Sequence, residues 1–389
     1  MYNFDTVVQR KGTVSRKWDC LIELYGDDEV LPLWVADMDF KSPPEVIDAL
    51  VRRAEHGVYG YTGFSDQYYE EFIGWAGRRY HWRPERDWIH FSPGVVTGLC
   101  LLINALTRPG DQILLLTPVY YPFLNVVRQN RRVVADCPLK NDGGFYTIDY
   151  ELLERRAKDA KLLMFCNPHN PVGRVWSRKE LEKVADICLR NKVTIISDDI
   201  HCDITMKGYQ YIPIASLSPE AAQITVTCMA PSKTFNIAGL KTSMIITPSR
   251  EISRACTQEA ERYSLKTSNL FGETALKVAY RTGDRWVDEL CGYLEGNIDY
   301  VIGALREMIP GIVLRKPEGT YLLWADFRGT AIENPYQFMV EQAKVAPSDG
   351  AHFSVSGSER FVRFNIASPR LLLEEAMRRI HRTISAQHL

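Results

Sequence analysis

The sequence predicts an α/β protein built on a mainly parallel sheet, and three observations support this. Between about residues 90 and 250, short apolar runs alternate with amphipathic helical stretches, the pattern of parallel strands joined by crossover helices. Several runs are apolar on both faces, as in strands covered on both sides. After about residue 283 the alternation stops, so we expect a second, smaller α+β unit there.

We expect a seven-stranded sheet flanked by helices. Six apolar runs are candidate strands: 112–118, 132–138, 161–168, 192–199, 222–228 and 242–248. A helix is expected over 177–192, because Ser177 and Glu180 have the spacing of a capping box at its start. In open α/β sheets, ligands collect beyond the carboxyl ends of the strands. The residues directly after each run are therefore the candidate site.

The length of 389 residues suits more than one domain. Residues 48–283 are expected to form the large domain, and residues 284–389 a small one. The small domain should contain a helix over 284–308, a short strand around Arg363 and a final amphipathic helix. The N-terminal segment, 1–47, looks irregular and is expected to dock on the small domain.

Composition argues against several classes of protein. The chain is 46% hydrophobic and 24% charged with a net charge of -1, which is ordinary for a globular protein and offers no long-range attraction to nucleic acid or anionic membranes. We see no apolar run of about 18 residues and no apolar core of a secretory signal. Nine scattered cysteines without a C-x-x-C motif favour a reducing compartment. We expect a cytoplasmic protein with no nucleic-acid or membrane partner.

Two of the expected loops carry backbone or amide groups suited to a ligand. Pro93 comes just before an apolar helical pattern, so Gly94, Val95 and Val96 would present free N–H groups at a helix N-terminus. Such a terminus binds phosphate. After the run 161–168, two Asn-Pro pairs make a rigid loop. This loop would fix the amide of Asn170 at the edge of the sheet.

The run 192–199 ends in two carboxylates, Asp198 and Asp199, and His201 and Asp203 follow. A carboxylate at the end of a buried strand is costly unless it meets a positive partner. Metal binding is an alternative, because His and Asp are metal ligands. Against it, residues one or two apart seldom converge on one ion without a second cluster. We therefore expect no metal.

Two cations stand at informative positions. Lys233 follows the run 222–228 in a tight bend, where a solvated turn lysine is the plain alternative. Arg363 alternates with apolar residues in a strand pattern. It is either a solvated edge charge or a clamp for a carboxylate. The motifs of a P-loop, a Rossmann dinucleotide site and a nucleophile elbow are all absent from the sequence.

The chain resembles the fold-type-I enzymes that use pyridoxal 5'-phosphate (PLP), the aspartate aminotransferase superfamily. Six segments carry the resemblance: LWVADMDF (33–40), TPVYYPF (117–123), NPHNPVGR (167–174), SDDIH (197–201), SKTFNIAGLK (232–241) and FNIASPR (364–370). The first two and the last resemble the MalY/PatB branch, which contains cystathionine β-lyases and cysteine-sulfur lyases. The resemblance covers essentially the whole chain, and six motifs in register make it specific.

This resemblance assigns roles to the polar residues after the strands. Lys233 would form the Schiff base with the cofactor aldehyde and, once substrate displaces it, act as the general base at Cα. Asp198 would pair with the pyridinium nitrogen, and Asn170 would hydrogen-bond the ring hydroxyl oxygen. His201 stands where many relatives have a tyrosine for that oxygen, and a supporting role behind the contact is equally open. Asp199 stands where relatives of this branch often have Glu.

Further roles follow from the same resemblance. Tyr120 would stack on the cofactor, and Tyr121 would face the substrate and help proton transfer, although ordinary core packing is the alternative for both. Arg363 would bind the substrate α-carboxylate. Tyr61 matches a tyrosine that crosses the interface of a homodimer to the neighbouring phosphate. The phosphate would be held by Gly94, Val95, Val96, Ser232 and Lys241, the last of which stands where many relatives have arginine.

The reaction implied is α,β-elimination from L-cystathionine or other S-substituted L-cysteines, which yields pyruvate, ammonia and a thiol. An aminotransferase is the alternative, because the same first steps precede both reactions. A regulatory protein-binding role on the same fold is a third hypothesis. The preferred sulfur substituent is not specified by any motif.

Overall fold

The structure is a computed structural model, and it describes residues 2–265 and 267–387. Its largest sheet has seven strands in the spatial order β2-β10-β9-β8-β7-β3-β4, and only β10 runs antiparallel to its neighbours. The predicted seven-stranded, mainly parallel sheet is therefore confirmed. Its strands are β2 (Ile89–Ser92), β3 (Gln112–Leu115), β4 (Val133–Asp136), β7 (Ala160–Cys166), β8 (Thr194–Asp198), β9 (Thr225–Met229) and β10 (Ser243–Ile246).

Six of these strands lie within the six apolar runs or extend at most one residue beyond them, whereas β2 lies in none of them. Its central residues, His90 and Phe91, are half-buried, so the strand lacks the continuous apolar pattern of the others. Helix α8 (Arg178–Asn191) begins at the predicted capping box: Ser177 Oγ accepts the N–H of Glu180, and the Glu180 carboxylate accepts the N–H of Ser177. The local start signal was sufficient in this case.

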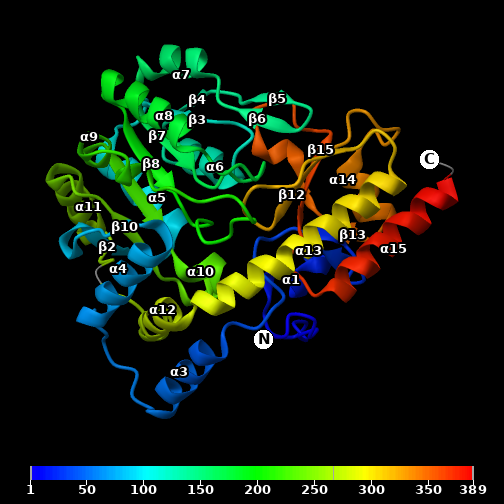
Figure 1. Ribbon diagram of the computed structural model, residues 1–389, viewed down its shortest axis with the longest axis horizontal. Helices are drawn as coiled ribbons and strands as arrows, with labels where there is room; N and C mark the ends of the chain where they lie inside the picture. Colours follow the sequence, from blue (N-terminus) through cyan, green and yellow to red (C-terminus); the bar gives the residue numbers. More distant parts are fainter. Residues whose placement is uncertain (1, 266, 388–389) are drawn as a thin grey trace.

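Helices cover both faces of the large sheet (Figure 1). Successive strand residues point to opposite faces, so Leu163 of β7 packs in one apolar core and Met164 in the other. The helices on the Leu163 side are α7 (Tyr150–Ala157), α8 and α9 (Pro219–Gln223); those on the Met164 side are α5 (Val95–Leu106), α6 (Tyr121–Gln129) and α11 (Arg250–Arg262). This two-sided burial explains the apolar runs.

A second unit is built on a four-stranded antiparallel sheet in the order β11-β12-β15-β14. The predicted helix 284–308 is α13 (Asp284–Met308), and the final helix is α15 (Arg370–Gln387). Figure 1 shows α13 in yellow running from the large sheet toward this unit, with α15 in red beside it. The strands are β11 (Val313–Leu314), β12 (Leu322–Asp326), β14 (Ser348–Asp349) and β15 (Phe361–Asn365).

The N-terminal segment is more regular than its sequence indicates. It forms α1 (Arg16–Asp19), α2 (Leu21–Tyr25) and β1 (Leu31–Pro32), elements too short to leave a periodic pattern. Strand β1 pairs in parallel with β13 (Val345–Ala346), which lies beyond α14 (Pro335–Gln337) in the chain. This pairing holds the N-terminal segment against the second unit.

Three more helices and one hairpin belong to the described part of the chain. Helices α3 (Pro44–Glu55) and α4 (Asp66–Tyr80) pack on α12 (Leu270–Thr282), and β5 (Lys140–Asp142) pairs with β6 (Phe145–Thr147). Between residues 2 and 387, leaving out 266, no helix has the length and apolar character needed to cross a membrane.

Candidate active site

A cavity of about 190 Å³ lies at the carboxyl edge of the large sheet. It is formed where β2, β7, β8 and β9 end, because these strands run in the same direction. Ten of the predicted site residues line it: Gly94, Val95, Val96, Tyr120, Asn170, Asp198, His201, Ser232, Lys233 and Lys241. Unpredicted lining residues include Ala36, Thr97 and Thr242.

Lys233 sits in α10 (Pro231–Thr234), one short turn after β9. Pro231 occupies the first position of this turn, where a missing N–H costs nothing. Lys233 lines the cavity, and its Nζ donates to the carbonyl oxygen of Ala36. Burial lowers the pKa of Lys233 to about 8, although the charge of Asp37 opposes this. A large share of the lysine is therefore a neutral amine at mildly alkaline pH. This is not the solvated turn lysine that the bend alone would suggest.

Asp198 is the last residue of β8, and its carboxylate is buried. Among the described residues the Asp198 side chain accepts one hydrogen bond, from the Ile200 N–H at 3.2 Å. Burial raises the pKa of Asp198 to about 7. A buried carboxylate with so few donors is costly, so this position suits a cationic partner supplied by a ligand.

His201 lines the same cavity and is buried. Burial holds the pKa of His201 well below its ordinary value, so the ring is neutral. Its Nδ1 has no hydrogen-bond partner within the described part of the chain, and its ring packs edge-on against Tyr321 at 5.6 Å. An unpartnered buried ring nitrogen is uncommon and is available to a ligand.

Arg363 comes from β15 of the second unit and contacts Asn170 in the loop that follows β7. Its Nη1 donates to Asn170 Oδ1 at 3.0 Å, and its Nη2 donates to the Trp34 carbonyl at 2.9 Å and to Ser348 Oγ at 3.1 Å. The side chain is buried, so the solvated-edge alternative is wrong. In residues 2–265 and 267–387 no carboxylate pairs with it, its Nε has no partner, and burial lowers the pKa of Arg363 to about 10.

The N-terminus of α5 differs in one detail from the expectation. The N–H of Gly94 is not free: it donates to the Ser92 carbonyl at 2.8 Å and to Ser243 Oγ at 3.1 Å. Gly94 has a φ of 106°, and a Cβ there would point into open space. The N–H groups without a partner in the helix are those of Val95, Val96 and the unpredicted Thr97. Three donors still face the cavity edge.

Of the remaining predicted residues, one lines the cavity and two lie outside its lining. Tyr120 lines the cavity, and burial raises its pKa. Tyr121 lies outside the lining; its ring packs edge-on against Phe353 at 5.6 Å, and the same phenylalanine lies under the Arg363 guanidinium at 4.9 Å. Tyr61 is fully exposed and outside the cavity. Tyr61 of this chain therefore does not reach the cavity of the same chain.

Asp199 and Asp203 point to protein partners. Asp199 accepts from Ser197 Oγ and Tyr211 OH, both at 2.5 Å, and Asp203 accepts from the Thr234 hydroxyl at 2.7 Å. No group of three His, Cys, Asp or Glu side chains in the described residues could hold a metal ion. Asp199 and Asp203 thus bind other side chains of the protein, whereas His201 lines the cavity.

Comparison with known proteins identifies the family. Residues 28–380 match the model of the family "Aminotransferase class I and II". The chain belongs to this family. It is 41% identical over 387 residues to the cystathionine beta-lyase PatB of Bacillus subtilis, covering 98% of this chain and 100% of the relative.

Two solved structures extend this likeness. Cystalysin from Treponema denticola, whose crystal structure contains PLP, has a TM-score of 0.95 and 35% identity over 100% of both chains. A PLP-bound aminotransferase candidate from Clostridium difficile 630 has a TM-score of 0.96 and 44% identity, covering 99% of this chain and 100% of that one. The cofactor of this family, PLP, is therefore the group to test against the cavity.

The residues that line the cavity suit both the ring and the phosphate of PLP. Asp198 and His201 offer a buried carboxylate and an unpartnered ring nitrogen, which suit a protonated ring nitrogen and a ring oxygen. The free N–H groups of α5, with Ser232 and the exposed Lys241, suit a phosphate. The amine of Lys233 lies on the wall of the same cavity. PLP is the cofactor that this donor set accommodates.

Proposed function

We propose that this chain is a PLP-dependent carbon–sulfur β-lyase that converts L-cystathionine or other S-substituted L-cysteines to pyruvate, ammonia and a thiol. The observation that carries the proposal is Lys233: an amine with a pKa lowered to about 8, on the wall of the same cavity as Asp198, Asn170 and the N-terminus of α5. The likeness to a cystathionine β-lyase over nearly the whole chain supports the choice of reaction.

PLP, when bound, supplies the electron sink that lets an amino acid lose its Cα proton and a thiolate at Cβ. The chain supplies the rest. Lys233 takes the Cα proton as a neutral amine, and Asp198 keeps the ring nitrogen protonated by its charge. Asn170 holds the ring oxygen and Arg363 binds the α-carboxylate, so the substrate is fixed at two points. Water then releases pyruvate and ammonia from the three-carbon product, which balances the overall reaction.

Asn170 has a double role in this proposal. Its Oδ1 already accepts from Arg363 at 3.0 Å, so its Nδ2 remains to donate to the ring oxygen of the cofactor. The amide thereby links the group that holds the substrate carboxylate to the group that holds the cofactor. His201, neutral and with a free Nδ1 among the described residues, is a second partner for the same ring oxygen. We also propose that Tyr121 faces the substrate and helps proton transfer; its packing against Phe353, which lies under Arg363, supports a place on the substrate side.

We further propose a homodimer in which Tyr61 reaches the cofactor phosphate of the neighbouring subunit. Tyr61 is fully exposed, and Val58 and Tyr59 beside it are largely exposed. An exposed apolar stretch of this kind usually has a partner surface. Analytical sedimentation should show a dimer. Tyr61→Phe should weaken PLP binding but leave the dimer intact. A monomer with full PLP affinity would contradict this assignment.

We also propose that the chain divides into three parts, residues 1–47, 48–283 and 284–389. We further propose that the protein is cytoplasmic. The second boundary is supported by Gly283, where α12 has ended and α13 begins. The nine cysteines are all unpaired, which favours a reducing compartment.

The decisive experiment is a product assay with purified, PLP-loaded protein and a panel of S-substituted L-cysteines. Pyruvate and free thiol should form in equal amounts without any keto-acid acceptor. An aminotransferase, favoured by the likeness to the Clostridium difficile structure, would instead need an acceptor and would exchange amino groups in equal amounts. Turnover that depends on a keto acid and releases no thiol would replace the lyase assignment with the aminotransferase one.

A further inference from the structure

Residues 34–40, here called the crossing segment, contact both functional cations through the backbone. The Trp34 carbonyl accepts from Arg363 Nη2 at 2.9 Å. The Ala36 carbonyl accepts from Lys233 Nζ and, at 3.0 Å, from the hydroxyl of Tyr321. The segment therefore lies between the lysine of the large sheet and the arginine of the second unit.

Two asparagines fix the backbone of the crossing segment. Asn365, two residues after Arg363, donates to the carbonyls of Val35 and Asp37, both at 2.6 Å. Asn236, three residues after Lys233, accepts the Met38 N–H at 3.0 Å and donates to the Met38 carbonyl at 2.9 Å. The segment is thus bonded to the chain on both sides of the cavity.

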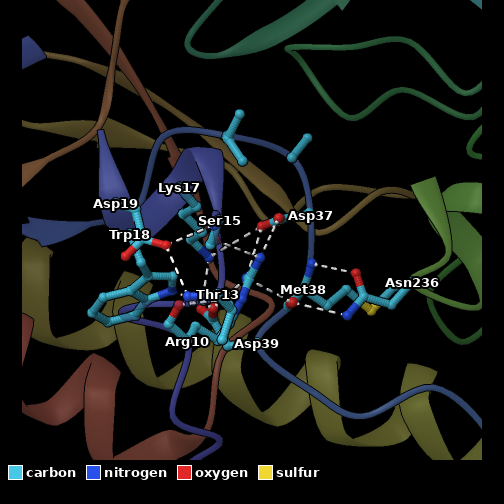
Figure 2. Close-up of polar contacts among 12 residues, drawn as sticks. Arg10, Thr13, Ser15, Lys17, Trp18, Asp19, Asp37, Met38, Asp39 and Asn236 are labelled. Carbon is cyan, nitrogen blue, oxygen red and sulfur yellow. Dashed lines mark hydrogen bonds and ion pairs between the residues drawn. The ribbon is translucent and has the colours of Figure 1, made fainter. Parts of the chain in front are cut away.

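Two cations outside the segment, Arg10 and Lys17, pair with two carboxylates of the segment, Asp37 and Asp39. We call these four residues the charge cluster (Figure 2). Arg10 donates to both oxygens of Asp37, at 3.1 and 2.6 Å, and to Asp39 at 2.7 Å. Lys17 donates to Asp39 at 2.6 Å. Figure 2 shows this cluster on one side of Met38 and Asn236 on the other.

The charge cluster is built with every charge paired. The side chains of Lys17 and Asp39 are 0% and 2% exposed, and Asp39 also accepts from Trp18 Nε1 at 2.9 Å and Ser368 Oγ at 2.6 Å. Burial alone would raise the pKa of Asp39, but Lys17 holds it below its ordinary value. Buried ion pairs add little net stability compared with apolar packing, so fixing a geometry is the better physical account of this cluster.

We propose that the charge cluster is a positioning device: by fixing the crossing segment, it holds the Ala36 carbonyl where that oxygen orients the amine of Lys233. This role rests on the proposed lyase function. A carbonyl can only accept, so it engages one N–H of the neutral amine and leaves the lone pair free to take the Cα proton. Arg10 also donates to the Met38 carbonyl at 3.1 Å, which ties the cluster to the backbone itself. The charge of Asp37 raises the pKa of Lys233 and so links the two groups electrostatically.

The test compares Arg10→Gln with Arg10→Lys in the PLP-loaded full chain. Arg10 is partly exposed, so both variants should fold. Arg86→Gln is the matched control, because Arg86 makes an ion pair of the same 2.7 Å length with Asp66 on the exposed surface. Three quantities are measured: hydrogen exchange of the amides of residues 35–40, the pH titration of the cofactor absorbance, and the separate values of kcat and KM.

Arg10→Gln should speed exchange in residues 35–40, displace the absorbance titration and lower kcat by about 10- to 100-fold with little change in KM. Arg10→Lys, which keeps the charge but loses the fork, should recover part of each effect, and Arg86→Gln should show none. Faster exchange with an unchanged titration and unchanged kcat would overturn the proposal, as would unchanged exchange. If the wild-type protein forms no pyruvate or thiol, the lyase function fails, and exchange and absorbance still decide the role of the cluster.

Discussion

The two sides of the cavity are built in different ways. On the side of the large sheet, Asp198 ends β8, and Lys233 and Asn170 each come four residues after a strand, so the sheet brings them together. On the other side, the crossing segment is held by Asn236 and Asn365, about 200 and 330 residues away in sequence, and by Arg10 and Lys17 of the N-terminal segment. The difference teaches that the reactive groups are placed by local topology, whereas their orientation depends on long-range contacts. Each prediction below probes one side against the other.

The largest effect is expected on the sheet side. Lys233→Ala removes the group that takes the Cα proton, and kcat should fall by about 10⁴-fold or more. The product assay for pyruvate and thiol measures this directly. Lys192→Ala, on the exposed end of α8, is the control and should retain full activity. Retention of a few per cent of wild-type kcat in Lys233→Ala would show that another base acts at Cα.

The second largest effect is expected where the two sides meet. Arg363→Met should lower kcat/KM by about 100-fold, chiefly through KM, because a buried charge pair with the substrate carboxylate is lost. Arg363→Lys should lower kcat/KM less, because lysine keeps the positive charge although it lacks the two parallel N–H donors of the guanidinium. A substrate whose α-carboxylate is esterified gives the matched control. The wild type should discriminate strongly against the ester and Arg363→Met only weakly; equal discrimination by both would exclude Arg363 as the carboxylate site.

More of the site could be predicted from the sequence on the side of the large sheet than on the side of the crossing segment. Asn170, Asp198 and Lys233 were candidates because polar residues at the ends of buried apolar runs are conspicuous, but their roles came only from the resemblance to the family. The Ala36 carbonyl was missed because a backbone acceptor leaves no trace in the residue type. The N–H of Gly94 was expected to be free, but Ser243, 149 residues away, accepts from it. The fold itself was predictable because covered strands and helix caps are local patterns, while short elements such as β1 are not.

A smaller effect should appear in the pH dependence of kcat. Burial lowers the pKa of Lys233 to about 8, and only the neutral amine accepts a proton, so kcat should rise as the pH increases through about 8. The Asp37 carboxylate raises this pKa and the Arg363 cation lowers it; Asp198 and Lys241 also face the amine, with opposite signs. Asp37→Asn should therefore move the rising limb to lower pH.

Arg363→Met serves as the opposite-sign control for this shift. Removal of a cation that lowers the pKa of Lys233 should move the same limb to higher pH. Both profiles are measured at saturating substrate, so that changes in KM do not enter. If the two variants move the limb in the same direction, the group that titrates is not Lys233.

The smallest effect is expected at the start of α8, a purely local feature of the sheet side. Ser177→Ala removes one half of a capping box, which should cost about 1 kcal/mol of unfolding free energy. Because α8 packs on the sheet away from the cavity lining, kcat and KM should stay unchanged. Arg10→Gln should show the reverse, with a larger kinetic effect than its loss of stability explains. Chemical denaturation gives the loss of unfolding free energy, and the product assay gives the loss of kcat. If the loss of kcat per unit of lost unfolding free energy were the same for both variants, positioning would be indistinguishable from simple destabilisation. The contrast between the two sides would then fail.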